Sequence, residues 1–156
     1  MYDTNRDLLD AYKATPDTLV TLLRGCSQEQ ASTARGGDEN WSVVEVLCHL
    51  RDAEEEALKR TRLMRDTDNP LLTPYDQEQL ATERNYAAAQ LHNALSAFMR
   101  LRATHVAELA ALRPEQWDRP GRHPEHGTIT IGNHTLHMVS HDAIHLAQIA
   151  RQLNGT

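Results

Sequence analysis

The stretch WSVVEVLCHLRDAEEEALKRTRLMR, residues 41–65, begins with the pattern of a helix N-terminus. Ser42 and Glu45 have the spacing of a capping box, in which each side chain accepts a hydrogen bond from the other residue's backbone N–H. Trp41 and Val46 flank them at the spacing of a hydrophobic staple, which fixes how the chain enters the helix. Apolar residues then recur every three or four positions, so the segment is predicted to be a helix with one buried face.

Three further segments carry the same helical period. Residues 4–24 form the first expected helix, in which Thr15 and Pro16 mark a cap or a kink. Residues 76–112 form the longest expected helix, and residues 130–153 form the last one. Strands are expected to be absent or short, because no segment shows sustained alternation of polar and apolar residues.

Two long connections separate these helices, DTDNPLLTP at residues 66–74 and PEQWDRPGRHPEHG at residues 114–127. Their prolines and glycines break the helical pattern, and each is long enough to cross the end of a bundle. The sequence therefore predicts an all-α four-helix bundle with long crossover connections, whose order is not simple up-down-up-down. A chain of 156 residues can bury one core, so residues 1–156 are expected to form a single domain.

Composition narrows the classes of function. Sixteen Lys and Arg against 22 Asp and Glu give a formal net charge of −6 without a basic block, which disfavours a nucleic-acid partner. No apolar run approaches the ~20 residues that span a bilayer. The segment MYDTNRDLLD lacks the features of a signal peptide, and only Cys26 and Cys48 are present. We therefore expect a reduced, cytoplasmic, soluble protein that does not contact a membrane.

Histidines in the last helix are the strongest functional signal. His137, His141 and His145 are spaced four apart and so share one helix face. With nine histidines in the chain, one such spacing is weak evidence, and a hydrogen-bonded histidine face is the alternative. His49, two turns inside the helix of residues 41–65, adds a third imidazole from another helix. Three imidazoles can hold a catalytic metal and leave coordination positions open.

These segments together resemble the DinB/YfiT-like family of four-helix-bundle metalloproteins. The resemblance rests on WSVVEVLCHLRDAE at residues 41–54, NPLLTPYDQEQLA at residues 69–81 and HPEHGTITIGNHTLHMVSHDAIHLAQIARQL at residues 123–153. It covers nearly the whole chain from about Asp10. The combination of W-S-x-x-E-V-x-x-H-L-x-D-x-E with a later H-x-x-x-H-L-x-Q-I is specific, although each motif alone is modest.

The resemblance implies that His49, His141 and His145 are the metal ligands. It also implies a divalent ion, nickel or zinc first, with iron or manganese as alternatives. Spacing makes three further residues candidates for the surroundings of the metal. They are His137 as a pocket wall, Asp52 as a carboxylate that orients His49, and Gln148 as a hydrogen-bond partner near the site.

What the family does favours one function, thiol transfer, over two alternatives. Relatives imply a transferase that joins a low-molecular-weight thiol such as bacillithiol to an electrophile, because a metal favours the thiolate form. The same site could activate water, as in a metal-dependent hydrolase. The third alternative is a non-catalytic metal-binding or sensing module. Cys48 is not the expected nucleophile, since it faces about 100° away from His49 on the helix.

The resemblance also implies a homodimer. Apolar residues beside the first long connection are expected to lack cover within one chain, which would favour self-association. These residues are Leu63, Met64, Leu71 and Leu72.

Overall fold

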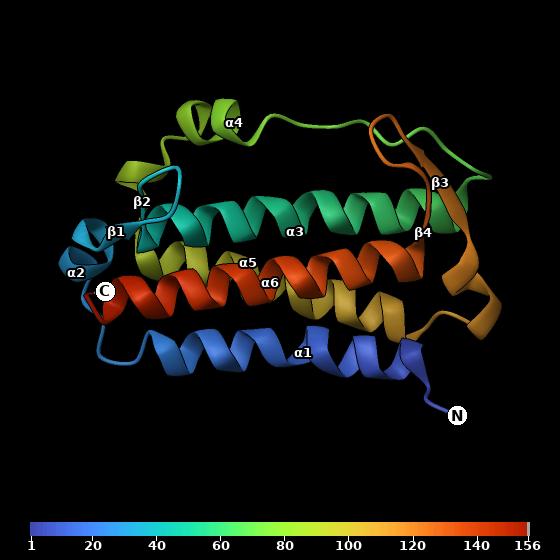
Figure 1. The fold of residues 1–156 in the computed structure, drawn as a ribbon, viewed down its shortest axis with the longest axis horizontal. Coiled ribbons are helices and arrows are strands. Elements are labelled where there is room, and N and C mark those ends of the chain that lie inside the picture. Colours follow the sequence, from blue (N-terminus) through green and yellow to red (C-terminus); the bar gives the residue numbers. More distant parts are fainter. Residues whose placement is uncertain (156) are drawn as a thin grey trace.

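Four long helices lie side by side along the length of the molecule (Figure 1), in a computed structural model that describes residues 1–155. They are α1 (Thr4–Leu22), α3 (Val43–Asp66), α5 (Leu91–Ala110) and α6 (Ile131–Leu153). Helix α3 packs against α5 and α6, and α1 packs against the same two helices. The bundle is therefore a square with α1 diagonally opposite α3.

The directions of the helices explain the long connections. Figure 1 shows α3 and α5 running from the end that holds the C-terminus toward the other end, whereas α1 and α6 run in the opposite direction. Because α3 and α5 are parallel, residues 67–90 must return along the whole bundle before α5 begins. The four-helix bundle with a crossover and without up-down-up-down order is thus confirmed.

Short elements close the two ends of the bundle. At one end lie α2 (Gln28–Thr33) and the antiparallel pair of β1 (Arg35–Gly36) and β2 (Trp41–Ser42). At the other end lie η2 (Pro114–Asp118) and the antiparallel hairpin of β3 (Pro120–His123) and β4 (Gly127–Thr130). Strands of two and four residues agree with the predicted shortness of any β-structure.

Helix starts follow the predicted chemistry with one exception. The complete capping box of Ser42 and Glu45 opens α3, and the Thr130 side chain accepts from the backbone N–H of Asn133 at the start of α6. The prediction of Thr15 as a cap was wrong, because Asp3 caps α1 and the helix continues through Pro16. The Thr15 hydroxyl instead donates to Asp142 at 2.7 Å.

The predicted single helix over residues 76–112 was also wrong. The structure divides it into α4 (Gln77–Glu83), the 3-10 turn η1 (Tyr86–Ala88) and α5. Asn85 adopts a left-handed backbone conformation with φ of 48°, which an α-helix cannot accommodate. Helix α3, with 24 residues, is therefore the longest.

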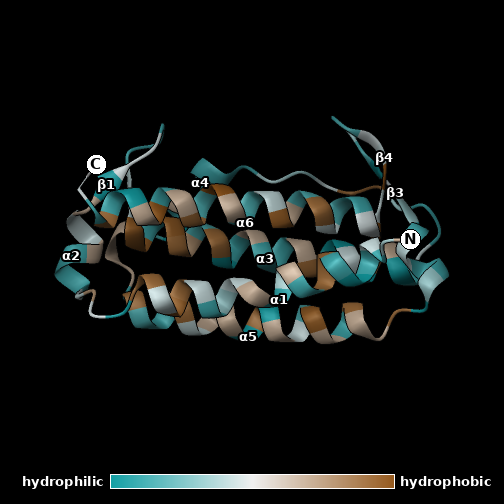
Figure 2. Cartoon of the chain, turned by 60° about the horizontal axis from the view of Figure 1, so that its bottom comes forward, coloured by the Kyte–Doolittle hydropathy of each residue, from teal (hydrophilic) through white to brown (hydrophobic). Residues whose placement is uncertain are grey.

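The core has two apolar halves separated by polar residues. Figure 2 shows that each long helix carries both hydrophobic and hydrophilic residues along its length. One half gathers Leu19, Leu47 and Phe98, and the other gathers Met64 and Leu109 with their neighbours. No helix among residues 1–155 combines the length and hydropathy needed to cross a membrane.

The expected apolar surface beside the first connection is only half present. Met64 and Leu72 are fully buried, because the hairpin β3–β4 packs over them, and Gly121 lies against both side chains. Leu63 and Leu71 are exposed, at 40% and 58%. Self-association stays a prediction, for which light scattering is the direct test.

Candidate metal centre

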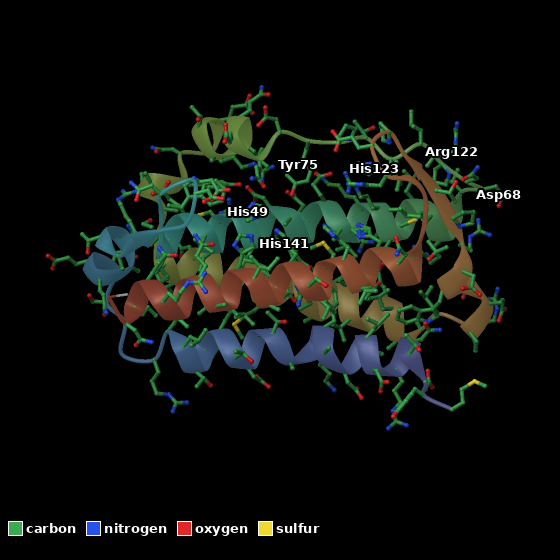
Figure 3. All side chains as sticks on the ribbon, in the orientation of Figure 1. His49, Asp68, Tyr75, Arg122, His123 and His141 are labelled. Atoms are coloured by element: carbon green, nitrogen blue, oxygen red, sulfur yellow. The ribbon has the colours of Figure 1, made fainter. Side chains whose placement is uncertain are left out.

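Three histidines from two helices meet between α3 and α6. His49 comes from α3, and His141 and His145 lie one turn apart on α6. One ring nitrogen from each of the three lies within 4.8 Å of the others. The Nε2 atoms of His49 and His141 are 2.9 Å apart, and Figure 3 shows these two residues between the helices. The structure thus brings together all three predicted ligands.

Burial keeps two of these imidazoles neutral. Loss of solvation lowers the pKa of His49 to about 4, and the neighbouring His145 acts in the same direction. Burial, followed by His145 and His49, lowers the pKa of His141 to about 2. A neutral imidazole has a free lone pair, which is the form that binds a metal.

Gln148 determines which nitrogen of His145 carries the proton. The Gln148 amide NH2 donates to the carbonyl oxygen of Gly36 at 3.2 Å, so its Oε1 faces Nδ1 of His145 at 2.8 Å. An amide oxygen only accepts, so Nδ1 carries the hydrogen, and in the neutral tautomer this leaves the lone pair on Nε2. This is the arrangement in which a hydrogen bond at one ring nitrogen orients a metal-ligating imidazole.

A glycine in the β1–β2 turn makes this arrangement possible. Gly37 has φ of +77°, and a Cβ at this position would lie 2.5 Å from Nε2 of Gln148. Any other residue would therefore displace the Gln148 side chain and strain the turn. The sequence alone does not reveal this contact, because the partner of Gly37 on α6 is more than one hundred residues away.

Of the other two predicted neighbours of the metal, His137 lies beside the site and Asp52 does not contact it. His137 lies one turn before His141, with ring centroids 6.4 Å apart, and lines the adjoining cleft. Asp52 does not bond to His49. Its carboxylate is held by Arg51, Arg84 and the hydroxyl of Tyr86.

Within residues 1–155, no carboxylate orients the ring of His49, and Cys48 is not suited to react at the site. Nδ1 of His49 is buried without a hydrogen-bond partner among the described residues, so no carboxylate orients this ring. Cys48 is fully buried, and burial raises the pKa of its thiol to about 11. A thiol that stays protonated is a poor nucleophile, as expected.

A buried polar network from all four long helices lies next to the three histidines. Arg102 is 1% exposed and binds Asp142 through two hydrogen bonds of 2.8 and 3.0 Å, and it contacts Glu54 at 3.0 Å. His105 contacts Glu54 at 2.7 Å, and the Tyr12 hydroxyl donates to the same carboxylate. Because Asp142 follows His141 directly, this network fixes the position of α6 and of its histidines.

A cleft of about 340 Å³ runs from His49 and His141 toward the β3–β4 end of the bundle. His49 and His141 line its inner end, and Arg60, Tyr75 and His123 line its outer part. Figure 3 shows Tyr75 and His123 on the side of α3 that carries the long connection. Sequence reasoning missed these three residues, because the connection that carries Tyr75 and the hairpin that carries His123 reach Arg60 on α3 only through long-range folding.

Comparison with known proteins identifies the family. A model of the DinB superfamily matches residues 11–149. The chain belongs to this superfamily. A relative from Oceanobacillus iheyensis, named "Putative metal-dependent hydrolase", is 31% identical over 135 residues, which are 86% of this chain and 77% of the relative. YfiT of Bacillus subtilis carries the same designation and is 25% identical over 121 residues, 74% of this chain and 67% of YfiT.

The fold of this DinB-superfamily chain matches that of a solved relative. The structure of YfiT from Bacillus subtilis, described as having an unusual four-helix bundle topology, superimposes with a TM-score of 0.88. The match covers 97% of this chain and 87% of YfiT at 23% sequence identity. The parallel α3 and α5 are therefore part of an architecture that this chain shares with YfiT.

Proposed function

We propose that this DinB-superfamily protein is a metal-dependent hydrolase of a small molecule, with His49, His141 and His145 as the metal ligands. The observation that carries the proposal is the meeting of three imidazoles, two of which, His49 and His141, are kept neutral by burial and line the inner end of a cleft. Three nitrogen ligands without a fourth protein ligand are typical of catalytic rather than structural sites. The designation of the relatives supports the same class of reaction.

The donor set fits a divalent ion. Imidazole nitrogens suit zinc, nickel, iron and copper, whereas magnesium and calcium prefer oxygen ligands. Among residues 1–155, this is the one group of three or more His, Cys, Asp or Glu residues with ligand atoms close enough to share an ion. When bound, a divalent metal supplies Lewis acidity that activates water at neutral pH.

Two residues of the chain orient and enclose the ligand rings of this centre. Gln148 holds the ring of His145, and Trp41 packs on the ring of His49 with centroids 5.2 Å apart. Trp41 is 7% exposed, so it excludes water from one side of the site. The cleft on the other side is of a size that suits a small substrate rather than a polymer.

Transfer of a low-molecular-weight thiol to an electrophile is the second proposal. It rests on the resemblance of the three motifs to relatives with that activity and on the suitability of imidazole-bound zinc or nickel for thiolate. Because Cys48 is buried and protonated, the thiol would have to come from a small molecule that enters the cleft.

An activity comparison separates the two reactions. The chain loaded with zinc, nickel or manganese is incubated with chromogenic esters and amides, and separately with bacillithiol, mycothiol, glutathione or cysteine plus a chromogenic electrophile. Hydrolysis predicts cleavage that His141→Ala slows by about 100-fold or more, while the exposed-site control His92→Ala keeps the wild-type rate. Thiol conjugation that depends on His141, without any cleavage, would overturn the hydrolase proposal.

A further inference from the structure

Arg60 is the one arginine that is shielded from solvent yet has no carboxylate partner within the described residues 1–155. The other shielded arginines all pair with Asp or Glu, at 2.7–3.2 Å; they are Arg51, Arg65, Arg102 and Arg119. The only hydrogen bond of the Arg60 guanidinium within this part of the chain is from Nη2 to the backbone oxygen of Thr73, at 3.0 Å. Its Nε is buried without a partner. A half-buried positive charge without a counter-ion is costly, so a bound anion would stabilise it.

Neutral hydrogen-bond donors surround this charge. Nδ1 of His123 accepts from the backbone N–H groups of Glu125 and His126, at 3.1 and 3.3 Å. The neutral ring therefore carries its hydrogen on Nε2. Burial and the nearby Arg60 lower the pKa of His123 and keep this form.

His134 adds a second, more deeply buried ring. Its side chain is 5% exposed, and its Nε2 has no hydrogen-bond partner in residues 1–155. Burial first, and the positive charge of Arg60 next, lower its pKa to about 3, so the ring is neutral. Both rings and Arg60 line the same cleft as His49 and His141.

Carboxylates in the cleft do not neutralise Arg60. Glu56 is bound by Lys59 at 3.0 Å, and Glu125 is solvent-exposed. A second metal site is not the explanation either, since no further group of potential ligands converges in residues 1–155. One unpaired positive charge with neutral donors matches a group that carries one negative charge, such as a carboxylate.

We propose that Arg60, with His123 and His134, binds a carboxylate of the substrate at the outer end of the cleft. This inference rests on the proposed function, because it places the hydrolysable bond at the three histidines. His134 and His141 lie seven residues apart on α6, which corresponds to about 10 Å along the helix. The substrate class is thus a small carboxylic acid whose ester or amide bond lies roughly that far from its acid group.

Binding is tested first without any reliance on catalysis. The full chain with His141→Ala is titrated calorimetrically with hexanoate and with hexanamide, so that the carboxylate cannot bind a metal at the three histidines. We expect hexanoate to bind more tightly than hexanamide. Arg60→Gln should weaken hexanoate binding by about 10- to 100-fold, whereas Arg100→Gln, which removes the same charge from an exposed position on α5, should not. Equal binding of the two ligands, or equal effects of the two variants, would overturn the inference.

Hydrolysis then tests the substrate class. The metal-loaded protein is given the 4-nitrophenyl half-ester of suberic acid and the matching ester of suberamic acid, which replaces the carboxylate by an amide. The acid should be preferred, and Arg60→Gln should abolish the preference. If the Arg60→Gln variant does not fold, Arg60→Met carries the test, since it removes the charge, keeps an apolar side chain and should abolish the preference.

The two proposals fail in different ways. Cleavage of both esters at equal rates, unaffected by Arg60→Gln, would uphold the hydrolase and overturn the carboxylate site. Hexanoate binding that depends on Arg60, in a protein that cleaves neither ester, would uphold the carboxylate site and overturn the hydrolase.

Discussion

Arg102→Met is expected to lower the free energy of unfolding by about 3–5 kcal/mol, because it leaves two buried carboxylates without their positive partner. Glu54 and Asp142 are 0% and 2% exposed, and Arg102 contacts both at about 3 Å. Burial acts to raise the pKa of Glu54, but the hydrogen bond from His105 and the charge of Arg102 outweigh it and hold the pKa below its usual value. Without Arg102, the effect of burial on Glu54 is opposed only by His105 and Tyr12.

The free energies of unfolding of the Arg102→Met variant and of the control variant Arg100→Met, both measured in urea, test this effect. Arg100 is exposed and lies half a turn away on the same helix, so its replacement should change stability by no more than about 0.5 kcal/mol. A loss below about 1 kcal/mol for Arg102→Met would contradict a structural role for the network. Since Asp142 adjoins His141, we also expect the variant to bind metal more weakly.

Acidification of the metal-free protein is expected to reduce its stability steeply below pH 6.5. Burial lowers the pKa of His49, His134 and His141 to about 4, 3 and 2 in the folded protein. In the unfolded chain each returns to about 6.5 and binds a proton that the folded state does not accept. Because the unfolded state then binds more protons, the free energy of unfolding falls as the pH falls.

The size of this effect follows from the number of histidines. Each contributes about 1.4 kcal/mol for every pH unit below 6.5, so the three together contribute about 4 kcal/mol per unit until His49 protonates near pH 4. Urea unfolding between about pH 7 and pH 5 measures the slope. His134→Gln should reduce it by about one third, and a free energy of unfolding that does not change over this range would show that the three rings are not buried neutral.

Local signals made the bundle predictable. The capping box of Ser42 and Glu45 and the helical period of apolar residues depend on neighbours within a few positions, so they predicted α3 and the last helix well. The break between α4 and α5 was missed because Asn85 lies within a helical pattern. Its left-handed conformation places Tyr86 in the core, where Tyr86 is 1% exposed and donates to Asp52.

The candidate site was predictable only in part. His141 and His145 share a face by spacing, and His49 joined them from its place inside the helix of residues 41–65. The resemblance of the motifs then implied all three as ligands. Asp52 was expected to orient His49, but two arginines and a tyrosine from long-range contacts hold it instead. The partner of Gln148, the carbonyl of Gly36, depends on how a distant turn folds onto α6, which no local pattern reveals.

The metal content of ligand variants tests the proposed centre most directly. The wild-type chain and His92→Ala, after loading with zinc or nickel and removal of free ion, should hold about one ion per chain. His49→Ala, His141→Ala and His145→Ala should each lose most of it, with folding verified by circular dichroism. Unchanged metal content in all three ligand variants would contradict the assignment of this site.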